Sequence, residues 1–135
     1  MLTPQDANTK NREICGLAPV IPVLTVTEVA HARPLAEALV AGGLPALEVT
    51  LRTPAALEAI RAMSDVPGGV VGAGTLITPQ DVRNAVDAGA KFGVSPGATP
   101  ALLAACAEAD LPLLAGAATA SEVMALMEAG YTVGK

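Results

Sequence analysis

A carboxylate and a guanidinium stand four positions apart in residues 46–54, which read Ala-Leu-Glu-Val-Thr-Leu-Arg-Thr-Pro. The aliphatic residues of this segment are typical of a buried strand, with Glu48 inside the strand and Arg52 at its carboxyl end. Because alternate residues of a strand share a face, Glu48, Thr50 and Arg52 are expected to point the same way. A charge in a buried strand is costly unless it is paired or takes part in chemistry. Ligand chemistry at the carboxyl end of the strand explains both charges, and a structural ion pair between them is the alternative.

Further candidate residues stand where other strands would end. Thr75 offers a hydroxyl directly after Gly72 and Gly74, and these glycines would let a ligand approach the backbone closely. Pro96 lies in a Ser-Pro-Gly loop, and Lys135 follows the last apolar run. Parallel β/α folds bind ligands at the carboxyl ends of their strands, which makes all three positions candidates for the same site. The ordinary alternatives are a turn role for Thr75, a plain loop around Pro96 and a solvated lysine at residue 135.

A repeated junction provides the framework for these residues. A threonine followed by proline or alanine recurs at intervals of 20 to 25 residues, and an alanine-rich amphipathic run follows each one. The threonines are Thr53, Thr78, Thr99 and Thr119. Threonine is a good helix N-cap, and proline suits the first helical position. Three helical runs end in Ala-Gly, and we expect left-handed glycine caps there, at Gly42, Gly89 and Gly130.

These signals predict an α/β fold in which short strands and helices alternate. The expected strands are residues 20–24, 46–51, 69–75, 92–95, 111–115 and 131–135. The expected helices are residues 9–15, 29–41, 54–63, 79–88, 100–109 and 120–129. The regular short units favour a (β/α)8 TIM barrel, here truncated to about six β/α units, over a doubly wound open sheet. We expect one domain over residues 1–135 that ends in the sixth strand, with the N-terminal segment closing the barrel bottom and with Met124 and Met127 at core spacing.

Composition excludes several classes of protein. The core must be aliphatic, because Phe92 and Tyr131 are the only aromatic residues among 135. The net charge of −5 argues against nucleic acid as a partner, since phosphate contacts need clustered lysine and arginine. No apolar run approaches the about 20 residues of a membrane span, and no signal peptide is expected. Cys15 and Cys106 stand alone, which indicates free thiols in a reducing compartment such as the cytoplasm, and no residue cluster has metal-ligand spacing.

Five segments together resemble one enzyme family. They are Pro-Val-Ile-Pro-Val at 19–23, Leu-Glu-Val-Thr-Leu-Arg-Thr at 47–53, Val-Gly-Ala-Gly-Thr at 71–75, Val-Ser-Pro-Gly at 94–97 and Ser-Glu-Val-Met-Ala-Leu-Met at 121–127. In this order they closely resemble the 2-keto-3-deoxy-6-phosphogluconate (KDPG) and 4-hydroxy-2-oxoglutarate aldolases. The segment at 47–53 is the most specific, because the related phosphogalactonate aldolases carry a different sequence there.

The resemblance implies a class I aldolase, a lyase without metal or cofactor, that cleaves KDPG to pyruvate and glyceraldehyde 3-phosphate. Many members of the family also act on 4-hydroxy-2-oxoglutarate. By resemblance, Lys135 is the Schiff-base lysine, Glu48 the general acid/base and Arg52 the residue that holds the pyruvate carboxylate. Thr75 would bind the substrate, and Pro96 would line the pocket. The implied assembly is a cytoplasmic homotrimer whose partners are small keto acids rather than nucleic acids or membranes.

The sequence departs from the family pattern beyond residue 135. The segments of the seventh and eighth barrel strands are absent, together with the loops that hold the substrate phosphate in the family. Because this leaves open sheet edges, we expect the 135-residue chain by itself not to be a competent aldolase. Two other hypotheses are a non-catalytic fragment or trimeric scaffold of the same fold and a different phosphate-binding barrel enzyme. The preferred stereochemistry of the sugar acid does not follow from these residues.

Overall fold

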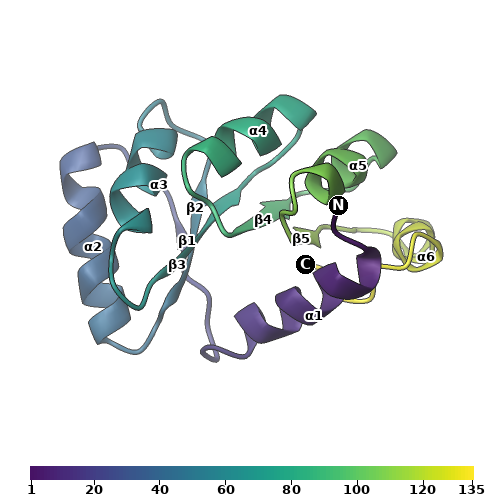
Figure 1. Ribbon diagram of the computed structural model, residues 1–135, viewed down its shortest axis with the longest axis horizontal. Helices are drawn as coiled ribbons and strands as arrows, with labels where there is room; N and C mark the ends of the chain where they lie inside the picture. The colour runs from purple at the N-terminus through teal and green to yellow at the C-terminus, as the bar shows by residue number, and fades with distance from the viewer.

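The computed structural model describes residues 1–135 and contains one parallel sheet (Figure 1). Its strands are β1 (Val23–Leu24), β2 (Ala46–Thr50), β3 (Val70–Gly74), β4 (Phe92–Ser95) and β5 (Leu113–Ala115). Each strand pairs with the next one along the chain, in the order β1-β2-β3-β4-β5. A doubly wound sheet reverses its strand order at a switch point, and this sheet does not. The prediction of a partial barrel is therefore confirmed.

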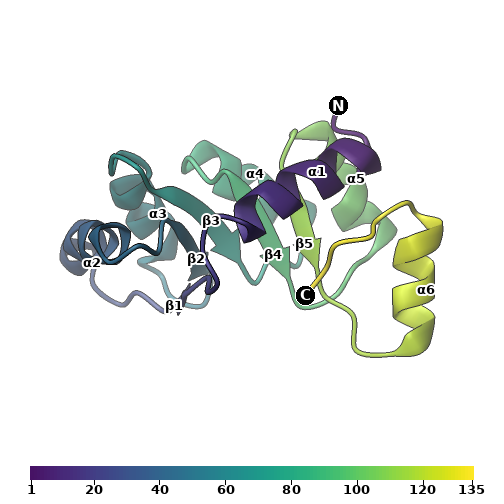
Figure 2. The same cartoon turned by 90° about the horizontal axis from the view of Figure 1, so that it is seen from below.

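Six helices accompany the sheet. They are α1 (Pro4–Cys15), α2 (Val29–Ala41), α3 (Ala56–Ser64), α4 (Pro79–Asp87), α5 (Pro100–Glu108) and α6 (Ala120–Glu128). Helices α2 to α5 cover one face of the sheet in succession, while α1 lies on the opposite side, beneath the opening between β1 and β5 (Figures 1 and 2). No helix combines the length and the apolar character needed to cross a membrane.

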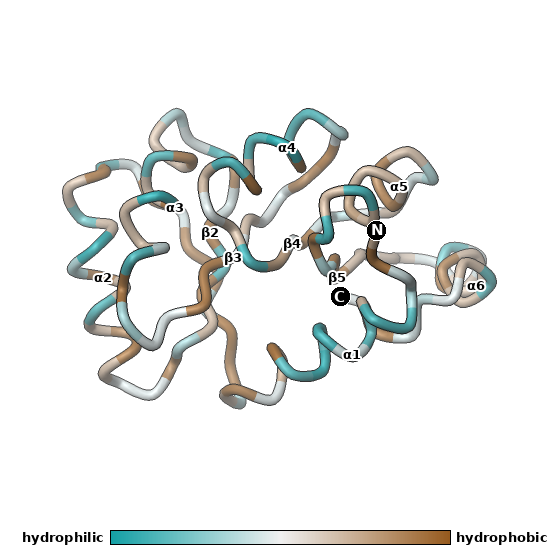
Figure 3. The backbone as a smooth tube through the Cα atoms, in the orientation of Figure 1, coloured by the Kyte–Doolittle hydropathy of each residue, from teal (hydrophilic) through white to brown (hydrophobic).

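The side chains of β2 divide between a layer that faces the helices and an inner layer. All five residues of β2 are buried. Leu47 and Val49 join the main hydrophobic cluster with residues of the helices, whereas Ala46 joins a smaller inner cluster with Ile14 and Phe92. Because side chains alternate along a strand, Glu48 faces the same inner side as Ala46, as the sequence predicts. Helix α1, which lies over this inner side, is largely hydrophilic along its length (Figure 3).

The threonine junctions act as caps at most of the predicted helix starts. The hydroxyls of Thr78, Thr99 and Thr119 each accept a hydrogen bond from a first-turn N–H of α4, α5 or α6. Thr53 is the exception and corrects the prediction, because its hydroxyl donates to the carbonyl of Val26 and α3 begins only at Ala56. The start predicted for the first helix was also wrong. Thr3 and Asp6 form a capping box, and α1 therefore begins at Pro4 rather than near residue 9.

Glycine ends the predicted helices with one change of position. Gly89 and Gly130 adopt the left-handed conformation with φ of 97° and 89°. Gly42, by contrast, has φ −78°, and the left-handed residue after α2 is Gly43 with φ 88°. The prediction was wrong by one residue there, because the Gly-Gly pair allows either position to reverse the chain.

Helix α1 is fixed to the late part of the chain by two asparagines. Asn8 Nδ2 donates to the Gly130 carbonyl at 2.9 Å, and Asn8 Oδ1 accepts from the Thr132 N–H at 2.9 Å. Asn11 Nδ2 donates to the carbonyl of Leu113, the first residue of β5. These contacts place α1 at the amino ends of the strands, where the sequence led us to expect the N-terminal segment.

The two edges of the sheet are shorter than predicted. The expected strand 20–24 pairs regularly only at Val23–Leu24, since Pro22 has no N–H to donate to a ladder. The expected strand 131–135 forms a single parallel bridge between Ala115 and Gly134. Met124 and Met127, which were expected in the core, are each 61% exposed on α6, because no neighbouring element covers that face.

Candidate active site

The residues singled out from the sequence meet in a cleft at the carboxyl ends of the strands. The cleft has a volume of about 280 Å³ and is lined by Glu48, Arg52, Thr75, Val94, Ser95, Pro96, Gly116, Ala117 and Lys135. These residues come from the ends of β2 to β5 and from the segment that pairs with β5. All five predicted site residues border one cleft, although they span 88 positions of the sequence from 48 to 135.

An amine and a carboxylate form the centre of the cleft. Lys135 Nζ lies 3.1 Å from Glu48 Oε2 and 3.4 Å from Glu48 Oε1. The side chain of Glu48 is only 5% exposed, whereas that of Lys135 is 52% exposed. The Lys135 backbone N–H donates to the Ala115 carbonyl at 2.9 Å, which holds the lysine beside β5. Glu48 is therefore buried against an amine that a ligand can still reach.

Arg52 has no acidic partner, which decides against the structural ion pair. The ion pairs of the chain include Glu48 with Lys135 but not Glu48 with Arg52. Arg52 lies two residues beyond the end of β2, is exposed and borders the same cleft. Its guanidinium is free to form two hydrogen bonds with a carboxylate ligand. Thr50, by contrast, donates to the Leu24 carbonyl at 3.1 Å and so binds β1 to β2.

Thr75 adopts a backbone conformation that threonine rarely takes. Its φ is 63°, in the left-handed region, where a β-branched residue is an outlier. The neighbouring backbone groups are satisfied without its side chain, because the Leu51 N–H donates to Gly74 and the Leu76 N–H to Val94. The Thr75 hydroxyl makes no hydrogen bond within the chain, which removes the turn role considered from the sequence. Strained backbone of this kind concentrates at functional sites.

The sequence did not single out four of the lining residues, Val94, Ser95, Gly116 and Ala117. Ser95 is among the lining residues, but its hydroxyl is buried and has no hydrogen-bond partner. Gly116 allows two backbone segments to meet, because a Cβ there would lie 2.5 Å from the Pro96 carbonyl oxygen. In the sequence, the glycine directly after the apolar run that ends at Ala115 was the signal that could have identified Gly116 as part of the cleft.

The sequence led us to expect that Gly72 and Gly74 of β3 let a ligand approach the backbone, and the structure corrects this expectation. A Cβ on Gly72 would lie 2.5 Å from the ring of Phe92, and one on Gly74 would lie 2.2 Å from Glu48 Oε1. Their missing side chains therefore make room for protein groups, not for the direct approach of a ligand to the backbone.

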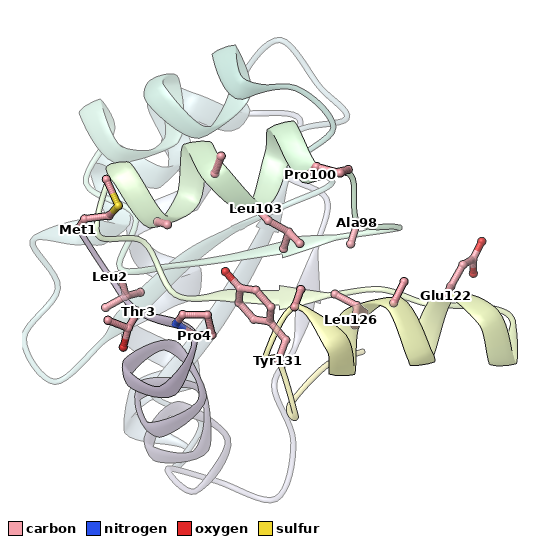
Figure 4. Close-up of a pocket in the computed structure, with 14 residues that line it drawn as sticks. Met1, Leu2, Thr3, Pro4, Ala98, Pro100, Leu103, Glu122, Leu126 and Tyr131 are labelled. Atoms are coloured by element: carbon pink, nitrogen blue, oxygen red, sulfur yellow. The ribbon is translucent and has the colours of Figure 1, made fainter.

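The largest cavity of the molecule lies elsewhere. It has a volume of about 590 Å³ and separates α5 from α6, with Leu103, Leu126 and Tyr131 among its lining residues (Figure 4). Burial, followed by the nearby Cys106, raises the pKa of Tyr131. Glu122 is its only acidic lining residue, and that carboxylate already accepts from the backbone of Ala118 and Thr119. Most of the residues that line this cavity are apolar, so the smaller cleft, where Lys135 and Glu48 meet, is the better candidate for chemistry.

The cleft has the groups needed for amine chemistry on a carbonyl compound. A lysine amine can add to a ketone, and an adjacent carboxylate can carry the protons that the addition and the loss of water require. Arg52 and Thr75 line the same cleft, and both residues carry hydrogen-bond donors that suit a small acid.

Comparisons with known proteins point in one direction. A family model described as KDPG and KHG aldolase matches residues 12–135. The chain is 48% identical over 123 residues to the KHG/KDPG aldolase of Escherichia coli K12, covering 90% of this chain and 58% of that protein. It is 53% identical over 117 residues to the 2-dehydro-3-deoxy-phosphogluconate aldolase of Zymomonas mobilis, covering 87% of this chain and 56% of that protein.

Solved structures agree with the sequence matches. The 2-keto-3-deoxy-6-phosphogluconate aldolase of Zymomonas mobilis ZM4 with 3-phosphoglycerate superposes with a TM-score of 0.88 at 48% identity, covering 92% of this chain and 59% of that one. The KDPG aldolase of Legionella pneumophila, with pyruvate captured as a covalent carbinolamine intermediate, gives 0.85 at 45% identity, covering 90% and 59%. This chain therefore spans somewhat more than half the length of the relatives it matches.

Proposed function

Because the chain belongs to the KDPG and KHG aldolase family, we propose that its cleft carries the reacting groups of a class I aldolase. The reaction is the cleavage of KDPG to pyruvate and glyceraldehyde 3-phosphate, and 4-hydroxy-2-oxoglutarate is a second substrate. The observation that supports this most strongly is the distance of 3.1 Å between the Lys135 amine and the buried Glu48 carboxylate. The capture of pyruvate as a carbinolamine in the Legionella pneumophila relative supports the same chemistry.

The proposed reaction begins with attack of the Lys135 amine on the C2 ketone of the substrate. Glu48 first takes a proton from the Lys135 ammonium group and passes it to the C2 oxygen as the carbinolamine forms. It then takes a second proton from the nitrogen and passes it to the new hydroxyl, which leaves as water and gives an iminium. The iminium draws the C3–C4 electron pair as Glu48 accepts the proton of the C4 hydroxyl. Glyceraldehyde 3-phosphate departs, Glu48 protonates C3 of the remaining enamine, and water releases pyruvate and restores the amine.

The other predicted residues hold the acid in place for these steps. We assign Arg52 to the substrate carboxylate, because its guanidinium has no acidic partner and borders the cleft. We assign Thr75 to a hydrogen bond with the substrate, because its hydroxyl has no partner within the chain and its backbone is strained. Pro96 forms an apolar part of the wall. The contacts with the phosphate are proposed to lie outside residues 1–135.

A trapping experiment tests the assignment of the amine. Incubation with pyruvate and borohydride should leave a carboxyethyl group on Lys135, identified by peptide mass spectrometry. Lys91, which is also exposed, provides the control, and Lys91→Arg should not change the trapping while Lys135→Arg abolishes it. Modification of other lysines in place of Lys135 would refute the proposal.

The role of the carboxylate needs its own variant. Glu48→Gln should slow proton exchange at the pyruvate methyl group by at least about 100-fold, the usual scale for a lost general base. Glu58→Gln changes an exposed carboxylate outside the cleft and serves as the matched control. An exchange rate near that of the original chain in Glu48→Gln would remove Glu48 from the mechanism.

We also propose a cytoplasmic homotrimer that takes small keto acids and phosphorylated sugar acids. The family resemblance supports the assembly, and the unpaired Cys15 and Cys106 support a reducing compartment. Sedimentation equilibrium tests the assembly directly, and a monomer at all concentrations would contradict it.

A further inference from the structure

Glu48 and Lys135 meet although three strands separate them in the sheet. Glu48 lies on β2, and Lys135 follows Gly134, which bridges to β5. The strands β3, β4 and β5 stand between them. The Glu48 side chain therefore has to extend over the inner face of β3 to reach the amine.

The inner face of β3 has no side chain at the two positions beside Glu48. Glu48 is paired with Gly72, and the next inward pair joins Thr50 to Gly74. A Cβ on Gly74 would lie 2.2 Å from Glu48 Oε1 and 2.9 Å from both Cδ and Cγ of the same residue. The three nearest atoms to that Cβ all belong to Glu48, so any side chain at residue 74 would compete with the carboxylate for its position.

Space alone explains the glycine at this position. Gly74 is the last residue of a regular strand and is not among the residues with positive φ, so alanine could adopt its backbone conformation. Gly72 has a different neighbour, because its missing side chain leaves room for the ring of Phe92 at 2.5 Å. The two glycines of the Gly-Ala-Gly segment therefore have separate purposes, of which only the second concerns the carboxylate.

We propose that Gly74 is a positioning residue for the aldolase reaction, because the missing side chain at residue 74 leaves the space in which the Glu48 carboxylate lies against the Lys135 amine. This inference rests on the proposed function. A methyl group at residue 74 would have to lie at least 3.0 Å from its neighbours, so it would push Oε1 away by 0.8 Å or more from its present 2.2 Å. Displacements of about 1 Å at a reacting group can cost about 100-fold in rate.

The test compares Gly74→Ala with the matched variant Gly97→Ala. Gly97 lies in the loop after β4, and a Cβ there meets nothing within 4 Å. Gly74→Ala should slow exchange of the pyruvate methyl protons by about 10- to 100-fold with little change in the pyruvate concentration at half-maximal rate. Gly97→Ala should leave both quantities unchanged. A Gly74→Ala rate equal to that of the original chain would overturn the proposal.

A double variant separates positioning from a general structural role. If Gly74 acts only through the carboxylate, adding Gly74→Ala to Glu48→Gln should change the remaining rate by less than about twofold. A further loss as large as that of Gly74→Ala alone would mean that Gly74 acts on another group. If the original chain does not trap pyruvate at all, the proposed function fails, and a crystal structure of Gly74→Ala still decides whether Glu48 leaves Lys135.

A stability measurement covers the case in which Gly74→Ala folds poorly. The clash disappears when Glu48 is shortened, so Glu48→Ala combined with Gly74→Ala should unfold at a urea concentration no lower than that of Glu48→Ala alone, and slightly higher because alanine restricts the unfolded chain. A loss of stability that persists without the Glu48 side chain would show that the methyl group meets something else and would overturn the proposal.

Discussion

Replacement of Thr75 by glycine should stabilise the fold while it weakens the site. An L-residue in the left-handed region costs about 1–2 kcal/mol, and Thr75 has φ 63°. Glycine removes this cost, but it also lowers the free energy of unfolding by about 0.4–1 kcal/mol because the unfolded chain gains conformational freedom. Taken at the centres of these two ranges, the net gain in the free energy of unfolding should be about 0.8 kcal/mol.

Three variants at this position separate the backbone effect from the hydroxyl effect. With a slope of about 2 kcal/mol per molar urea, Thr75→Gly should raise the unfolding midpoint by about 0.25–0.5 M. Thr75→Ala keeps the strained φ and should show no such gain. Both variants lack the hydroxyl and should trap pyruvate on Lys135 about tenfold more slowly, the effect of one lost hydrogen bond to a charged intermediate. Thr75→Ser retains the hydroxyl and should retain most of the trapping rate.

Two results would refute this reasoning. If Thr75→Gly unfolds at or below the midpoint of Thr75→Ala, the left-handed backbone is not strained by the side chain. If Thr75→Gly traps pyruvate as fast as the original chain, the hydroxyl does not touch the substrate, and the strain has no catalytic purpose.

Three further predictions concern the fold around the cleft. Asn8→Ala removes both hydrogen bonds to residues 130–132 and should lower the free energy of unfolding by about 2 kcal/mol. The control Thr9→Ala, at an exposed neighbour, should lower it by less than about 0.5 kcal/mol, and equal urea midpoints for the two variants would contradict this prediction. Burial raises the pKa of the Cys106 thiol to about 12. A thiol reagent at pH 8 should therefore label the exposed Cys15 at once and Cys106 only after unfolding. Rapid labelling of both cysteines in the folded chain would contradict the burial of Cys106. Hydrogen bonds from the N–H groups of Ala118 and Thr119 lower the pKa of Glu122, so its stabilising contribution is complete above the ordinary value of 4.5 and is lost as the pH falls through the lower folded value. The difference in urea midpoint between the original chain and Glu122→Gln should narrow below pH 4.5, and a constant difference would argue against the cap.

Local chemistry made the helices predictable, and non-local pairing made the strand ends difficult. The starts at Pro79, Pro100 and Ala120 follow from threonine caps whose partners lie three residues away. The same Thr-Pro signal failed at Thr53, because the carbonyl of Val26, distant in sequence, takes its hydroxyl. The extents of the first and last strands depend on which neighbours pair with them, and the sequence of one strand does not contain that information.

Sequence reasoning predicted five residues that border the cleft, but it did not predict the other four lining residues or the geometry of the cleft. Alternation along β2 was enough to place Glu48 inside, and the carboxyl-end rule was enough to gather Thr75, Pro96 and Lys135. The left-handed φ of Thr75 and the empty space over Gly74 arise only when strands pack together. The exposed position of Arg52 follows from the turn after β2, which replaced the predicted helix start.

The asparagine contacts of α1 have a consequence for the order of folding. Each sheet pairing joins consecutive units, so the chain can add one strand at a time as it is synthesised. The contact from Asn8 to Gly130 instead spans 122 residues. Closing a loop of that length costs about 1.4 kcal/mol more than closing one of 25 residues. Helix α1 should therefore be the last element to dock and the first to exchange its amide hydrogens with solvent.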